Sequence, residues 1–93
     1  MEFPAKQLLM LLDLVRGKKE WGPEVFDAAM EVLSYVYHNF INKAPVPIGE
    51  INDFDPESAI ESLLNEEAKG ISPTIWISLG IWILQKVIER MAK

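Results

Sequence analysis

Residues 71–84 of the chain read ISPTIWISLGIWIL, and this stretch decides which fold the sequence can adopt. Ser72 and Pro73 predict a helix start, because serine is a favoured N-cap and proline suits the first helical position. The residues that follow, 75–84, carry no charge on any side. A helix that is apolar all round must be buried all round. The sequence therefore predicts a helix over 73–92 whose first half contacts protein on every side.

Two other interpretations of this stretch are weaker. Alternating isoleucine and tryptophan also has high β propensity, but the proline start and a stripe at helical spacing favour the helix. The stripe consists of Ile77, Ile81, Leu84, Ile88 and Met91. A single membrane span needs about 20 apolar residues, and the uncharged run is about half as long. We therefore do not expect the chain to cross a membrane.

Three more helix starts lie upstream. Pro4, Pro23 and Pro56 each precede a run of helical periodicity. Residues 43–55, which contain two further prolines, predict a long connection. The expected fold is a single all-α, compact four-helix domain over residues 1–93, with helices at about 4–16, 23–42, 56–69 and 73–92.

The apolar helix also predicts an oligomer. Three other helices in a small domain cannot easily surround a fourth, whereas a second subunit would cover what remains. Small residues among bulky ones would let a partner approach the backbone closely. The hypothesis is a homodimer with an interface at or near Trp76, Ile77, Gly80, Ile81 and Trp82. Because tryptophan is enriched in binding hot spots, the same surface is also a candidate docking site for another protein.

Charge is segregated along the chain, whose net charge is −5. Residues 20–68 hold eleven acidic side chains and one basic one, while both ends are mildly basic. Such a field repels nucleic acid and steers a basic protein partner. We expect an acidic partner surface at Glu57, Glu61 and Glu66; a well-solvated acidic face is the alternative.

The sequence offers little for catalysis or metal binding. The chain has no cysteine, which removes disulfides and thiolate chemistry and fits a cytoplasmic protein. His38, the one histidine, can share a helical face with Asp27 and Glu31, but Glu31 and His38 are seven positions apart, whereas paired helical ligands lie three or four apart. The serines have no plausible base. We therefore expect no enzyme activity and no cofactor or metal.

These patterns favour a small non-enzymatic helical interaction protein, an adaptor, regulator or inhibitor that acts through protein–protein contacts as a homodimer. Two alternatives stay open. One is a peripheral membrane protein, with helix 73–92 or 4–16 laid into a bilayer and Lys86, Arg90 and Lys93 at the headgroups. The other is a small metal-binding or enzymatic protein that uses His38.

Overall fold

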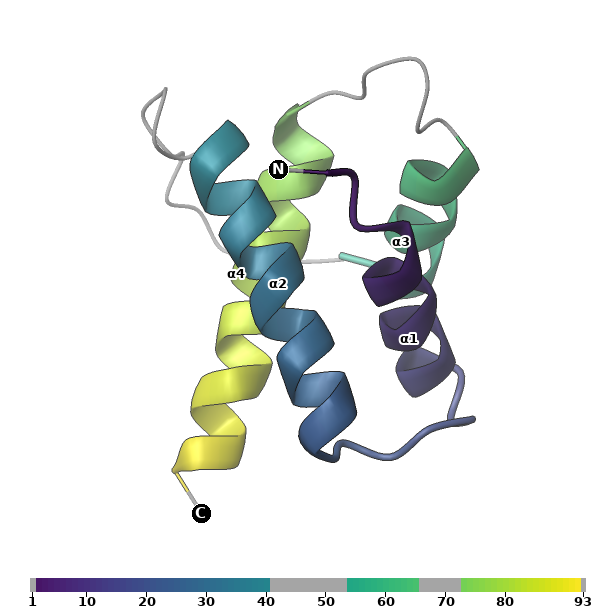
Figure 1. The fold of residues 1–93 in the computed structure, drawn as a ribbon, viewed down its shortest axis with the longest axis vertical. Helices are drawn as coiled ribbons and strands as arrows, with labels where there is room; N and C mark the ends of the chain where they lie inside the picture. The colour runs from purple at the N-terminus through teal and green to yellow at the C-terminus, as the bar shows by residue number, and fades with distance from the viewer. Residues whose placement is uncertain (1, 41–53, 66–72, 93) are drawn as a thin grey trace.

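The computed structural model describes residues 2–40, 54–65 and 73–92. Within these residues the chain forms four helices and no strand, so the predicted all-α four-helix fold is confirmed (Figure 1). The helices are α1 (Ala5–Val15), α2 (Pro23–Asn39), α3 (Pro56–Asn65) and α4 (Pro73–Met91).

The prolines mark the helix starts closely. Pro23, Pro56 and Pro73 are first residues of their helices, whereas Pro4 lies one position outside, as the N-cap of α1. Its ψ of 60° is not helical, so the predicted start of this helix was one residue early. The connection 43–53, the predicted helix ends 41–42 and 66–69, and Ser72 lie outside the described residues.

Helix α1 ends in a Schellman turn centred on Gly17. Gly17 has a positive φ of 79°, which a residue without Cβ adopts at no steric cost. Its N–H donates to the Leu14 carbonyl at 3.1 Å, and the Lys18 N–H donates to the Asp13 carbonyl at 2.8 Å. These are the two hydrogen bonds that define the motif, and they reverse the chain toward α2.

Helix α2 begins with a hydrophobic staple. Gly22 is the N-cap, so Trp21 and Phe26 stand at the positions just before the cap and four residues into the helix. Their rings meet edge to face, with centroids 6.5 Å apart. The contact fixes the angle at which the chain enters α2.

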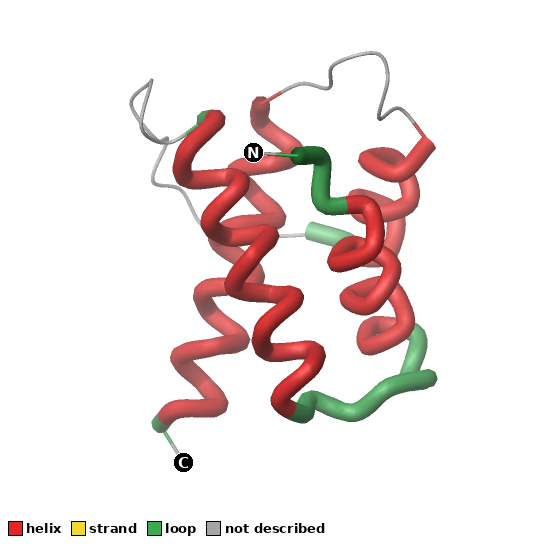
Figure 2. The backbone as a smooth tube through the Cα atoms, in the orientation of Figure 1, coloured by secondary structure: helices red, strands yellow, loops and turns green. Residues whose placement is uncertain are grey.

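The four helices pack in two pairs. Helix α1 contacts α2 and α3, and α4 contacts the same two helices from the other side. Figure 2 shows the α2–α4 pair and the α1–α3 pair as two neighbouring layers. Each helix thus turns one stripe toward a shared core. The fully buried large side chains are Leu8, Leu11, Val32, Val36, Ile60, Leu63, Leu79 and Ile83.

The first half of α4 is covered largely by the chain itself. Trp76 is 3% exposed and packs in an aromatic cluster, with Tyr35 at 4.9 Å and Phe40 at 5.8 Å between ring centroids. At Gly80, a Cβ would lie 3.0 Å from Val36 Cγ1 and 3.7 Å from Leu33 Cδ1. Glycine therefore lets α2 and α4 approach closely at this point.

Asp55 caps α3, as its position before Pro56 predicts. Its Oδ1 accepts the backbone N–H of Glu57 at 3.1 Å and of Ser58 at 3.4 Å, and its Oδ2 accepts the Ser58 hydroxyl at 2.7 Å. These bonds to the charged form, the Ser58 hydroxyl first among them, hold the pKa of Asp55 below its ordinary value of 3.8.

Substitution of Gly80 tests the α2–α4 contact. Gly80→Leu places a branched side chain against Val36 and should lower the free energy of unfolding by about 2–3 kcal/mol. Gly80→Ala should change it by less than about 1 kcal/mol, because better helix propensity offsets the tight contact. Urea denaturation measures both. Gln85→Leu, at an exposed position of α4, is the control; equal stability of Gly80→Leu and this control would contradict the packing.

The Asp55 cap makes a pH-dependent contribution to stability. Because the folded-state pKa is lowered, the contribution is complete above pH 3.8 and is lost as the pH falls through the folded-state value. Asp55→Ala should therefore melt at a lower temperature than the wild type at pH 7, with the difference narrowing below pH 3.8. Asp55→Asn keeps an acceptor for the helix N–H groups but not the charge, so at pH 7 it should melt between the wild type and Asp55→Ala. If the melting temperatures of Asp55→Ala and the wild type differed by the same amount across pH 2–7, the proposed contribution of the ionised Asp55 cap would be wrong.

Candidate interaction surface

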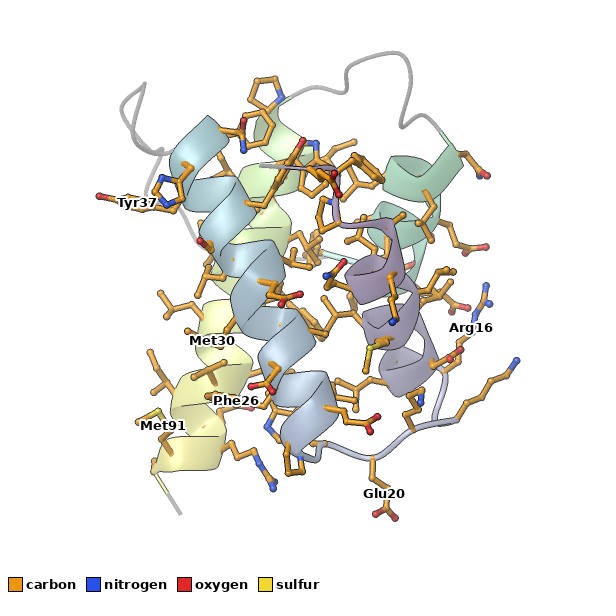
Figure 3. The ribbon with its side chains drawn as sticks, in the orientation of Figure 1. Arg16, Glu20, Phe26, Met30, Tyr37 and Met91 are labelled. Carbon is orange, nitrogen blue, oxygen red and sulfur yellow. The ribbon has the colours of Figure 1, made fainter. Side chains whose placement is uncertain are left out.

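Large apolar side chains remain exposed along one side of the α2–α4 pair. They are between 40% and 75% exposed, and none is charged. We call this set the outer face; it consists of Met30, Tyr37, Leu84, Ile88 and Met91. Figure 3 draws Tyr37, Met30 and Met91 along the same edge of the molecule.

Helical spacing explains how the outer face forms. On α2, Met30, Leu33 and Tyr37 stand at i, i+3 and i+7, and on α4, Leu84, Ile88 and Met91 stand at i, i+4 and i+7. Half-buried Leu33 approaches the backbone of α4 where the helices pack together at Gly80. The two stripes therefore lie beside the α2–α4 contact at Gly80, one on each helix, and together they make up the outer face.

The size of the outer face sets it apart from scattered surface residues. With about 200 Å² for a large side chain in the open, the exposed fractions amount to about 500 Å². The largest apolar patch on a typical monomer is about 300–600 Å², and patches of this size are often functional. The outer face is thus a candidate binding surface.

The predicted interface at the first half of α4 lies mostly inside the chain. Trp76, Ile77 and Gly80 are buried, while Ile81 and Trp82 are half-buried. Contact of a second copy with these residues stays a prediction. The exposed apolar positions of α4 lie further along the same helix, at Leu84, Ile88 and Met91.

The predicted acidic surface is partly neutralised by Arg16. This arginine caps the end of α1 and reaches across to α3, where its Nε lies 2.7 Å from Glu57 Oε2 and its Nη2 lies 3.0 Å from Glu61 Oε2. The hydrogen bond that Arg16 donates to Glu57, the largest cause, raises the pKa of Arg16. Glu66 lies outside the described residues. A basic partner at Glu57 and Glu61 would have to compete with Arg16.

His38 lies exposed near the end of α2, next to the ring of Tyr37, with centroids 5.6 Å apart. Glu31 accepts a hydrogen bond from Gln7 of α1, which ties this carboxylate to the neighbouring helix. Across residues 2–40, 54–65 and 73–92, no cluster of three or more histidine, aspartate or glutamate side chains is placed to hold a metal ion.

None of the helices in the described part of the chain combines the length and apolar character needed to cross a bilayer. The fold and this surface place the chain in a broad class, small four-helix proteins with an exposed apolar face. Comparison with models of protein families, with curated proteins and with solved structures gives no match.

Sequence reasoning missed most of the outer face, although its signal was visible. The stripe through Leu84, Ile88 and Met91 indicates a helix, but helical spacing alone does not say which of its residues are exposed. Their exposure follows from the pairing of α2 with α4, which leaves one flank of each helix uncovered. The Arg16 ion pairs join positions 41 and 45 residues apart, beyond the reach of a local pattern.

Loss of the Arg16 ion pairs should have a small, salt-dependent effect. Arg16→Gln frees the carboxylates of Glu57 and Glu61, but exposed ion pairs contribute little and are screened by salt. The melting temperature should fall by at most about 4 °C at low ionic strength, and the difference should vanish in 1 M NaCl. Lys6→Gln, which removes a charge elsewhere on α1, is the control. A fall in melting temperature of more than about 4 °C that persists in 1 M NaCl would contradict the solvent exposure of the Arg16 ion pairs.

Proposed function

We propose that the protein is a small, non-enzymatic helical interaction protein that works through protein–protein contacts as a homodimer, with the outer face as its interface. The observation that supports this is the set of exposed apolar side chains on α2 and α4 that make up the outer face. An adaptor, regulator or inhibitor would use such a dimer to present two copies of its remaining surface.

The area of the outer face suits a dimer. Homodimer interfaces are about 65% apolar, so about 500 Å² of apolar surface corresponds to about 800 Å² buried on each subunit. This is the standard size for a specific, stable interface. A larger interface would need additional residues from the flanks of the two helices.

Charge favours a second copy over a different partner at this face. In a two-fold dimer the same patch meets itself, so any charge at its centre would meet a like charge. The five residues of the outer face carry none. A basic protein, by contrast, would be steered toward the acidic side chains of α2, such as Asp27 and Glu31. The absence of charge on these five side chains supports a second copy as the occupant of the outer face.

Two leucines of similar exposure provide a matched test. Leu84 on the outer face is 46% exposed, and Leu9 on α1 is 52% exposed. The wild type should scatter light with twice the mass of the 10.6 kDa chain. Leu84→Gln enters a two-fold interface twice, so at about 1 kcal/mol per site the dimer dissociation constant should rise about 30-fold. Leu9→Gln should leave the dimer unchanged.

Several outcomes would contradict the homodimer. One is a monomer mass for the wild type across the full concentration series. Another is equal weakening by Leu9→Gln and Leu84→Gln, with both variants retaining the helical circular dichroism of the wild type. A monomer that floats with anionic vesicles, and loses this property in Leu84→Gln, would instead assign the outer face to a lipid surface.

A further inference from the structure

A cleft of about 490 Å³ lies at the end of the bundle where α1 finishes and α3 begins. Its apolar walls come from four parts of the chain: the last turn of α1, the connection to α2, the start of α3 and the second half of α4. The apolar wall residues are Leu14, Val15, Trp21, Pro56 and Trp82. Ligand pockets usually measure about 300–1,000 Å³ and are mainly apolar, so the size and lining suit a small molecule.

The charged residues of the cleft all come from α4 and favour an anion. Lys86, Glu89 and Arg90 line it, which leaves one net positive charge. Lys86 Nζ lies 3.5 Å from Glu89 Oε2 and 5.9 Å from the centroid of the Trp82 ring. Arg90 forms no ion pair with any residue that the structure describes. The Arg90 guanidinium can therefore form an ion pair with the carboxylate of a ligand in the cleft.

Trp21 adds a polar group that lacks a partner. Its indole Nε1 is buried, and no acceptor lies within hydrogen-bond distance among the described residues. An indole N–H can only donate, and leaving such a donor buried without an acceptor costs free energy. Because this atom is buried, a ligand in the cleft meets the ring of Trp21 and not its N–H.

The cleft is separate from the outer face. Residues two positions apart on a helix point about 200° away from each other, so Lys86 and Ile88 lie on opposite sides of α4. A substitution at Arg90 should therefore not disturb the proposed dimer. Likewise, Leu84→Gln should leave the cleft intact.

We propose that this cleft binds a small amphipathic anion, an acyl or aryl monocarboxylate whose apolar body lies against Trp21 and Trp82 and whose carboxylate meets Arg90 and Lys86. The match rests on two properties of the cleft, its apolar walls and its one net positive charge. The site goes beyond the proposed interaction function and does not depend on it.

Titration with decanoate tests the proposal, with decanol and decyltrimethylammonium as neutral and cationic probes of the same chain length. Decanoate should quench or shift the tryptophan fluorescence of the full chain with saturation, and the other two probes should bind at least about fivefold more weakly. Arg90→Gln and Lys86→Gln should each raise the dissociation constant for decanoate about fivefold, the upper range for an exposed ion pair. Lys6→Gln, which removes the same charge far along α1, should leave it unchanged.

The indole N–H resonances locate the bound probe. Decanoate should move the Trp21 and Trp82 resonances and leave that of Trp76, which is buried in the aromatic cluster, in place. Trp21→Phe keeps an aromatic ring but has no indole N–H, so the resonance that disappears in this variant is assigned to Trp21. Absence of saturable binding would overturn the proposal. So would equal affinity for decanoate and decanol, equal effects of Arg90→Gln and Lys6→Gln, or a shift confined to Trp76.

Discussion

The close packing of α2 and α4 at Gly80 is the constraint on which the rest of the structure depends. A Cβ at position 80 would lie 3.0 Å from Val36 Cγ1 and 3.7 Å from Leu33 Cδ1, so side chains of α2 pack against the backbone of α4. This approach brings Leu79 and Ile83 into the core and gives Trp76 its aromatic neighbours. A bulky residue at this point would separate the helices and expose the most apolar segment of the chain.

The same packing explains why one face is left uncovered. Helix α4 turns its buried stripe toward α2 and α3, and no third neighbour among the described helices covers its remaining flank. A chain of this size has few elements with which to cover a helix that is apolar on most sides. The uncovered apolar positions are therefore concentrated in the second half of α4 and on the adjoining stripe of α2, rather than at the tryptophans.

The number and type of the helices could be predicted from the sequence because their signals are local. Proline at the first turn, Gly17 after α1 and Asp55 before α3 act within a few residues of where they stand. The distribution of burial could not be predicted in the same way. It depends on which helices pair, and Gly80 meets Val36 across 44 positions of the chain. The cleft was missed for the same reason, since Leu14, Trp21, Pro56 and Trp82 converge only in the folded chain.

The turn at Gly17 also bears on the order in which the chain can fold. Helices α1 and α2 are joined by residues 16–22, so their contact closes a short loop and costs little chain entropy. The contacts of α3 with α1 and of α4 with α2 close much longer loops, as the Arg16 to Glu57 and Val36 to Gly80 separations show. Residues 66–72 join α3 to α4 at a similar separation, so the α1–α2 and α3–α4 pairs are the units that can form early, before the two longer loops close.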